Sequence, residues 1–93
     1  MKKYEVMYIL KADLDDASRN ELIGKLNQTL AADGGSVENV NEWGLRDLAY
    51  EIKKERKGYY VVVEVLASAA SVDEFVRVTR INTNVLRQLV IAK

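Results

Sequence analysis

The sequence predicts an α+β fold in which a four-stranded antiparallel sheet carries two helices on one of its faces. Four segments alternate apolar and polar residues or are rich in strand formers, and two others repeat apolar residues at helical spacing. The 93 residues are 48% hydrophobic, which is sufficient for one small core. We therefore expect a single domain spanning residues 1–93.

Residues 3–11 are expected to form the first strand. One of its faces is apolar throughout and consists of Tyr4, Val6, Tyr8 and Leu10. We expect this face to pack against the helices, which leaves Met7 and Ile9 on the uncovered face, where Tyr60 and Val62 would join them. An apolar patch of this kind indicates a surface for a protein partner, although ordinary half-exposed sheet surface is the alternative.

The first helix is expected within residues 13–35. Its apolar stripe consists of Leu22, Ile23, Leu26 and Leu30. Acidic residues gather around its start, at Asp13, Asp15 and Asp16, where they favour the helix dipole. Gly34 is positioned as the C-terminal cap. The helix should therefore end shortly before Gly34.

The segment WGLRDLAYEI, residues 43–52, changes its alternation halfway. Trp43 and Leu45 occupy odd positions, whereas Leu48, Tyr50 and Ile52 occupy even ones. A β-bulge at Arg46 and Asp47 would explain this shift, because one extra residue bends a strand and lets both apolar halves face the same core. We expect one long bent strand beginning near Val37; two strands joined by a turn are the alternative.

The remaining elements follow from local patterns. KKERKG, residues 53–58, is expected to form a turn before GYYVVVEVL, residues 58–66, the segment richest in strand formers. Residues 68–81 repeat apolar residues at helical spacing, and Ser71 and Glu74 have the separation of a capping box. Residues 84–91 complete the order βαββαβ, which the right-handed crossover rule folds into a ferredoxin-like sandwich.

Several classes of function are disfavoured by the residues present. The chain has no Cys and no His, which removes disulfides, Cys/His zinc sites and imidazole catalysis. The carboxylates lie mainly at a helix start, and Gly34 and Gly35 follow a helix rather than open one, so neither an acid-base pair nor a phosphate cradle is indicated. We expect neither an enzyme nor a bound metal or cofactor. The N-terminus does not resemble a signal peptide and no long apolar run is present, so we expect a cytoplasmic protein without a membrane segment.

The formal net charge is zero, but the charges are unevenly distributed. Residues 10–42 contain seven acidic and three basic residues, whereas residues 75–93 contain four basic residues and no acidic one, and residues 53–57 read KKERK. Local basic surface is therefore available. Lys57, Gly58 and Tyr59 match the start of the strand signature of RRM-type RNA binders, but Tyr60 and Val61 do not, so base stacking on the sheet is not expected.

Four segments together resemble a known family over essentially the whole chain. They are MKKYEVMYIL, WGLRDLAYEI, KGYYVVVEV and RINTNVLRQLVIAK, and in this order and spacing they are similar to the bacterial small-subunit ribosomal protein S6 family. The most specific part is Leu-Ala-Tyr followed by a basic turn and Gly-Tyr-Tyr. The resemblance implies a structural ribosomal protein of the cytoplasm that pairs with the small-subunit protein S18 and binds the central domain of 16S ribosomal RNA.

The chain departs from the family pattern in three ways. Arg46 and Asp47 stand where a basic pair is common, which puts a role of position 47 in RNA binding in doubt. The sequence contains no proline, although family members often carry prolines near the first helix and after Leu-Ala-Tyr. It ends at Lys93, so we expect that an extended C-terminal tail of some relatives is absent.

Phosphate neutralisation requires only correctly placed Lys and Arg side chains, which this chain offers in several segments. The expected RNA contacts are Lys2, Lys3, Arg46, Lys53, Lys54, Arg56, Lys57, Arg80 and Arg87. The expected contacts for the protein partner are Met7, Ile9, Tyr60 and Val62. The alternative is a ferredoxin-like module that forms homo-oligomers or binds a regulatory ligand through its open sheet face, without RNA.

Overall fold

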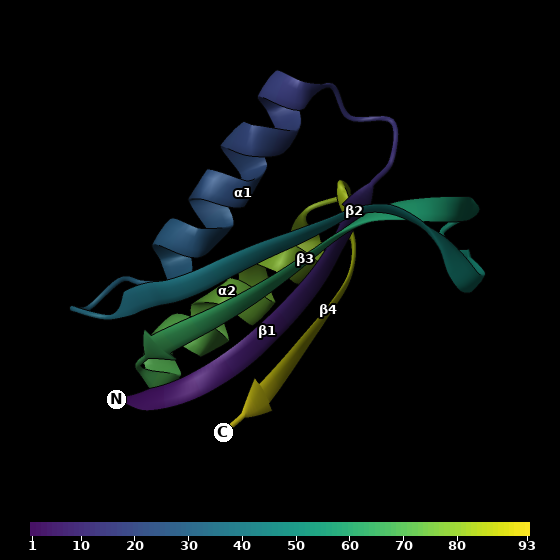
Figure 1. Cartoon of the computed structure of the whole chain (residues 1–93). Coiled ribbons are helices and arrows are strands. Elements are labelled where there is room, and N and C mark those ends of the chain that lie inside the picture. The colour runs from purple at the N-terminus through teal and green to yellow at the C-terminus, as the bar shows by residue number, and fades with distance from the viewer.

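The computed structural model describes all residues, 1–93, and has the expected βαββαβ order (Figure 1). Its elements are β1 (Lys2–Lys11), α1 (Asp16–Leu30), β2 (Ser36–Ile52), β3 (Glu55–Ala67), α2 (Ala69–Ile81) and β4 (Val85–Ala92). The strands form one antiparallel sheet in the order β2-β3-β1-β4, and both helices cover the same face. The predicted ferredoxin-like fold is confirmed.

The core lies between the helices and the covered face of the sheet, as the alternation of β1 predicts. Val6, Tyr8 and Leu10 are fully buried and belong to one cluster with Leu26 of α1 and Phe75 of α2. Alternate residues of a strand point to opposite faces, so this burial leaves Met7 and Ile9 on the other, open face. Burying a side chain of this size contributes about 1.5–3 kcal/mol, which makes this cluster the main source of stability.

Helix α1 begins where the acidic residues predict but ends earlier than expected. Asp15 is the N-cap, and its carboxylate accepts a hydrogen bond from the backbone N–H of Ser18 at 2.7 Å. This bond holds the pKa of Asp15 below its usual value. The C-cap is Ala31, so the prediction that Gly34 caps the helix is wrong. Gly34, with a φ of 81°, instead turns the chain towards β2.

Helix α2 is capped by a different serine from the one predicted. Ser68 is the N-cap and accepts a hydrogen bond from the N–H of Ser71 at 3.1 Å. The predicted capping box of Ser71 and Glu74 is therefore wrong, because the helix begins before Ser71. The hydroxyl of Ser71 is buried and donates to the carbonyl of Ala32 at 3.1 Å, which ties α2 to the end of α1.

Strand β2 is one long strand, as expected, but its bulge lies elsewhere. Arg46 and Asp47 pair in regular succession with β3, and the register shifts between Val37 and Asn39, between Glu42 and Gly44, and again between Asp47 and Ile52. The predicted bulge at Arg46 and Asp47 is therefore wrong. Trp43 is the extra residue of the bulge between Glu42 and Gly44. Gly44, with a φ of 84°, adopts the backbone conformation that such a bulge favours.

The two apolar halves of β2 do not face a common core, which is a second correction. Leu45 is 59% exposed and Tyr50 is 60% exposed. Leu48 and Ile52 are half-buried, and they pack over the open face of the sheet. The connection to β3 is also tighter than predicted, because it consists only of Lys53 and Lys54, with φ angles of 50° and 65°. Strand β3 accordingly begins at Glu55 rather than at Gly58.

Candidate functional site

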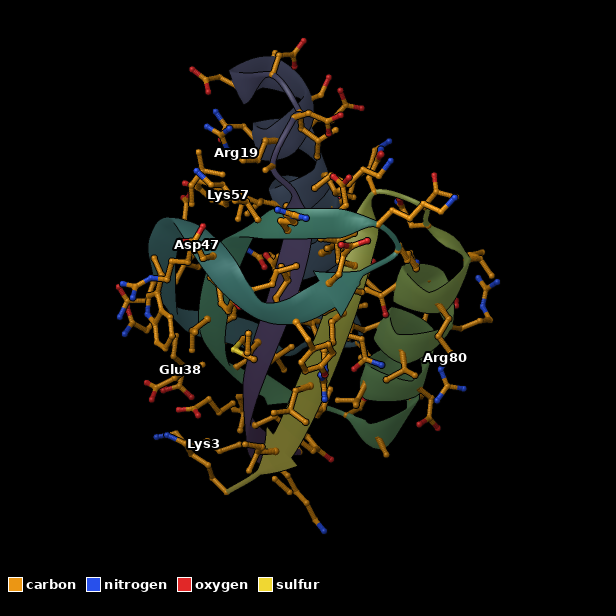
Figure 2. All side chains as sticks on the ribbon, turned by 90° about the vertical axis from the view of Figure 1, so that its right-hand side faces the viewer. Lys3, Arg19, Glu38, Asp47, Lys57 and Arg80 are labelled. Carbon is orange, nitrogen blue, oxygen red and sulfur yellow. The ribbon has the colours of Figure 1, made fainter.

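The end of the β2–β3 hairpin, residues 48–57, bends across the open face of the sheet (Figure 2). We call this segment the hairpin end. Gly58 is buried where the hairpin crosses β1, and a side chain there would meet Ile9 and Leu48. Between the hairpin end and the sheet lies an apolar cavity of about 170 Å³, with eight hydrophobic residues among the nine that line it. The hairpin end thus covers part of the face that the topology leaves open.

Two polar contacts attach the hairpin end to β4. The Lys53 ammonium donates to the backbone carbonyl of Val85 at 3.2 Å. The Arg87 guanidinium donates to the hydroxyl of Tyr50. Both contacts join residues that are more than 30 positions apart in the sequence, so they depend on the hairpin end lying down on the sheet.

Three of the predicted RNA contacts converge on one shallow hollow. It has a volume of about 270 Å³ and is lined by Lys53, Thr79, Arg80, Val85, Leu86, Arg87 and Gln88. We call it the basic hollow. Its basic residues come from the hairpin turn, from the last turn of α2 and from β4. No carboxylate lines it, so the three positive charges are not neutralised locally.

A second basic pair lies on the β2–β3 hairpin. Arg46 and Lys57 line a hollow of about 440 Å³ together with Leu45 and Asp47. The Asp47 carboxylate lowers the positive potential of this site, so an anion should bind here more weakly than in the basic hollow. The Arg46 guanidinium also lies over the Trp43 ring, 5.2 Å from its centroid.

Trp43 belongs to an aromatic array that the sequence analysis did not anticipate. Its ring stacks beside Tyr60 with the centroids 6.3 Å apart and the planes 8° from parallel. The bulge at Gly44 turns Trp43 to the same face as Tyr60, so the contact depends on the register shift. The Trp-Gly pair in a strand was the available signal, because glycine there often marks a bulge.

The other predicted basic residues are dispersed. Lys54 and Arg56 are exposed at the hairpin end, where Arg56 lies 3.8 Å from the Glu51 carboxylate. Lys2 and Lys3 lie at the opposite end of β1, and Lys3 lies 3.7 Å from Glu38 (Figure 2). The structure therefore does not bring Lys2 and Lys3 together with the basic hollow.

The predicted partner residues do share one face, although one of them is covered. Ile9 pairs with Tyr60 and Met7 pairs with Val62 in the register of β1 and β3. Met7, Tyr60 and Val62 are half-buried, whereas Ile9 is only 3% exposed because the hairpin end lies on it.

Strand β4 extends this face with two residues that were not predicted. Leu89 and Ile91 are 43% and 48% exposed, and they lie beside Met7 and Glu5 in the register of β1 and β4. Their alternation in the segment NVLRQLVI was the signal that pointed to them. The exposed apolar surface on the open face is therefore wider than predicted.

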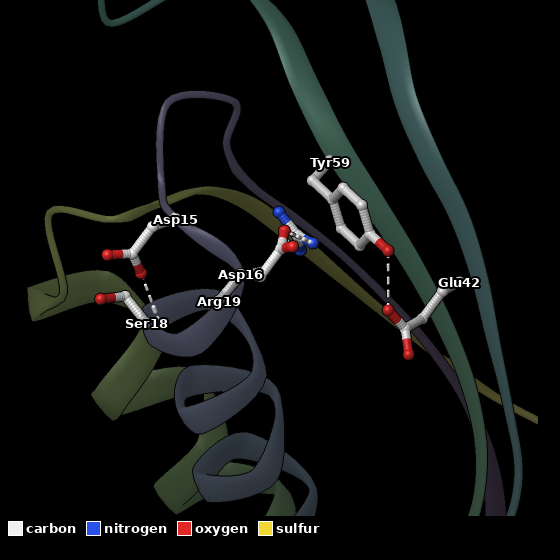
Figure 3. A network of polar contacts seen from close by, with 6 residues as sticks. All are labelled: Asp15, Asp16, Ser18, Arg19, Glu42 and Tyr59. Atoms are coloured by element: carbon white, nitrogen blue, oxygen red, sulfur yellow. Dashed lines mark hydrogen bonds and ion pairs between the residues drawn. The ribbon is translucent and has the colours of Figure 1, made fainter.

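A polar network on the helix side fixes the start of α1 to the hairpin (Figure 3). The Arg19 guanidinium lies 4.4 Å from the centroid of the Tyr59 ring and bonds the Asp16 carboxylate at 2.6 Å. The Tyr59 hydroxyl donates to Glu42 at 2.7 Å, which raises the pKa of Tyr59. Because Arg19 is committed to these contacts, this network is structural rather than a site for anions.

Comparison with known proteins shows that residues 3–92 match the family model described as Ribosomal protein S6. The chain belongs to the ribosomal protein S6 family. It is 47% identical over 90 residues to "Small ribosomal subunit protein bS6" of Halalkalibacterium halodurans, with 97% of this chain and 95% of the relative covered. The protein of the same name from Desulforudis audaxviator is 45% identical over 91 residues, with 98% and 97% covered. The family predicted from the four segments is confirmed.

A solved structure shows the same fold as this S6 family member. The 30S ribosomal protein S6 from Thermotoga maritima aligns with a TM-score of 0.91, covering 99% of this chain and 87% of that one, at 24% identity. Within this chain, no group of three His, Cys, Asp or Glu side chains is placed to hold a metal ion. No helix has both the length and the apolar character needed to cross a membrane.

Proposed function

We propose that this chain is a structural component of the small ribosomal subunit that binds the backbone of ribosomal RNA jointly with a protein partner. Family membership supports the ribosomal role, and the relatives from bacteria carry the name of a small ribosomal subunit protein. The proposed RNA is the central domain of 16S ribosomal RNA and the proposed partner is protein S18. The site of action is then the ribosome in the bacterial cytoplasm.

The basic hollow is the observation that carries the proposal. Its cationic groups, Lys53, Arg80 and Arg87, face a common space without an acidic neighbour. Arginine and lysine in such a group neutralise phosphate oxygens and release counterions, which is the dominant sequence-independent contribution to RNA affinity. This mode of binding needs no base-edge contact and is compatible with a chain whose total charge is zero.

The remaining basic residues supply weaker or separate contacts in this proposal. Arg46 and Lys57 form a second contact, which Asp47 weakens. Lys54 and Arg56 extend the basic surface at the hairpin end. Lys2 and Lys3 lie at one end of β1, whereas its other end pairs with Val85 of the basic hollow, roughly 30 Å away at 3.3 Å per residue, so these two lysines meet a different part of the RNA.

The open face is the proposed surface for the protein partner. Met7, Tyr60 and Val62 form its centre, and Leu89 and Ile91 widen it towards β4. An apolar surface of this kind is most stable when a partner covers it. Because the chain itself is neutral, a basic partner would provide much of the phosphate contact, and the pair should bind RNA far better than either protein alone.

A filter-binding titration on the central-domain RNA fragment, with and without S18, tests the proposal. Replacing Arg80 by Ala should weaken binding by the pair and reduce the salt slope by about one unit, as expected for one lost phosphate contact. Arg77→Ala is the matched control, because Arg77 lies on the same helix but is paired with Glu74. RNA binding that is tight, insensitive to salt and unaffected by Arg80→Ala would contradict the proposed mechanism.

The exposure of Leu89 and Ile91 also favours the alternative, a module that self-associates through the open face. Apolar self-association should persist at high salt, whereas phosphate binding should not. Sedimentation of the isolated chain at low and high salt distinguishes the two. A salt-resistant dimer that does not bind the RNA fragment, even with S18, would favour the alternative.

A further inference from the structure

We propose that Lys53, Arg80 and Arg87 form a discrete phosphate site that is complete only while the hairpin end lies on the sheet, so that phosphate binding and hairpin closure stabilise each other. This inference rests on the proposed function, because it names one phosphate subsite of the RNA-binding surface. It also adds a mechanical link between that subsite and the apolar cavity under the hairpin end.

The site is assembled from one residue of the hairpin turn and two residues of the body of the fold. Arg80 and Arg87 belong to α2 and β4, which are part of the body of the fold. Lys53 belongs to the two-residue turn of the hairpin and reaches the hollow because its ammonium is 3.2 Å from the carbonyl of Val85. If the hairpin end lifts off the sheet, Lys53 leaves and the hollow loses one of its three charges.

The contacts that close the hairpin leave donors free for an anion. An ammonium has three donors, of which Val85 occupies one on Lys53. A guanidinium has five N–H donors, and Arg87 uses one of them to bind the Tyr50 hydroxyl. Arg80 is exposed and takes part in none of the ion pairs of the chain. A phosphate can therefore be bound by all three residues without opening the hairpin end.

Arg87 connects the phosphate site to the open face. It lines both the basic hollow and the apolar cavity. Among the nine residues that line the cavity, it is the only charged one. The ring of Tyr50, held by Arg87, forms part of the cavity wall beside Met7 and Leu89. Fixing Arg87 with a phosphate therefore also fixes the shape of an apolar recess on the proposed partner surface.

The hairpin end is suited to such coupling because it is weakly held. Tyr50 is largely exposed, a cavity of about 170 Å³ lies beneath the hairpin end, and two side-chain hydrogen bonds attach it to β4. A ligand that binds only the closed state multiplies the closed-to-open ratio by one plus its concentration divided by its dissociation constant. By linkage, closing the hairpin must raise phosphate affinity by the same coupling factor.

Amide hydrogen exchange of the full chain, followed by NMR with and without inorganic phosphate at constant ionic strength, tests the inference. At about ten times the dissociation constant, phosphate should slow exchange of the hairpin-end amides by up to about tenfold, the full value being reached if the open state does not bind phosphate. Arg80→Ala should leave exchange nearly unchanged without phosphate, because the Arg80 side chain forms no hydrogen bond or ion pair with the hairpin end, but should abolish most of the slowing. Arg77→Ala should retain the full effect of phosphate.

A second variant separates the hairpin contact from the phosphate site. Tyr50→Phe removes the hydrogen bond to Arg87 but retains the ring, so exchange without phosphate should become about two- to tenfold faster, as expected for one hydrogen bond. Phosphate should still slow exchange in this variant, because the three cations remain. Unchanged exchange in Tyr50→Phe would show that the bond does not hold the hairpin end, and it would overturn the coupling.

Two further results would overturn the site. In the first, phosphate does not change amide exchange of the hairpin end in the wild-type chain. In the second, phosphate slows this exchange equally in the wild type and in Arg80→Ala. RNA binding measured in parallel with S18 separates this inference from the proposed function. Intact RNA binding without a phosphate effect on the hairpin refutes only the coupled site, whereas a phosphate effect without RNA binding refutes the ribosomal RNA role.

Discussion

Gly58 marks the point where the β2–β3 hairpin crosses β1, and its replacement by alanine tests how the hairpin end is positioned. A Cβ atom at this residue would lie 2.3 Å from Cγ2 of Ile9 and 3.5 Å from Cδ2 of Leu48. Ile9 belongs to β1 and Leu48 to the hairpin end, and both side chains line the space between the sheet and the hairpin end. Gly58→Ala should therefore force the hairpin end away from β1 or distort the side chain of Ile9.

The cost can be worked out from this geometry. Close Cβ contacts begin at about 3.4 Å, so the contact with Ile9 is about 1.1 Å too short. Ile9 is buried and its β-branched side chain has few allowed rotamers, so it can relieve the contact only by shifting towards the cavity that it lines. Overpacking of this kind costs about 1–3 kcal/mol, partly offset by the gain of about 0.5–1 kcal/mol that alanine brings over glycine. We expect a net loss of up to about 2.5 kcal/mol in the free energy of unfolding.

Urea denaturation followed by fluorescence of Trp43, the only tryptophan, measures this loss. The control is Gly24→Ala in α1, where a Cβ meets nothing within 4 Å and should stabilise the helix by about 0.5–1 kcal/mol. Adding Ile9→Ala to Gly58→Ala removes the clashing methyl group, so the two changes should cost at least about 1 kcal/mol less together than the sum of their separate effects. Strict additivity would refute the proposed contact.

Three further predictions concern other parts of the chain. Lys54→Gly should stabilise the hairpin by about 0.5–1 kcal/mol, because glycine accepts the φ of 65° without strain; Lys54→Ala, which keeps the strain, should show no gain in urea denaturation. Ser71→Ala should cost about 1 kcal/mol by the same measurement, because the carbonyl of Ala32 loses its buried donor, and an unchanged midpoint would show that this bond does not contribute. The hydrogen bond from Lys93 holds the pKa of Glu64 below its ordinary value of 4.5, so the pair stabilises the fold above that pH and loses this contribution as the pH falls through the lowered pKa. Lys93→Ala should raise the Glu64 pKa towards the ordinary value in an NMR titration, and an unchanged pKa would exclude Lys93 as the cause.

The fold was predictable because its apolar pattern is local and strongly periodic. Val6, Tyr8 and Leu10 alternate without interruption, and Leu26 and Leu30 repeat at helical spacing. Each pattern identifies one buried face, and the short connections then limit how the elements can be arranged. Helix ends were less predictable, because several candidate caps, such as Ser68 and Ser71, lie within one turn of each other.

The bulge in β2 could not be located from the alternation alone. The apolar pattern shifts between Leu45 and Leu48, but the backbone register is regular from Gly44 to Asp47 and shifts only after Asp47. The pattern shifts because Leu48 packs over the open face of the sheet, where Met7 and Ile9 form a second apolar floor. The shift in the apolar alternation therefore marks a change in the surface that the strand packs against. That the second surface is the open face of the sheet becomes clear only from the bend of the hairpin end.

The candidate site shows a similar division between local and tertiary information. Sequence alone can separate Arg77 from Arg80, because Glu74 lies three residues before Arg77 on the same helix, whereas no acidic residue stands three or four positions before Arg80. It cannot show that Lys53 lies beside Arg80 and Arg87, since that depends on where the hairpin end comes to rest. Charge density along the chain thus identifies too many candidates, including Lys2 and Lys3 at the far end of β1. What distinguishes the basic hollow is that free cations from three elements meet in one place, and that meeting is a consequence of the same hairpin bend that buries Ile9.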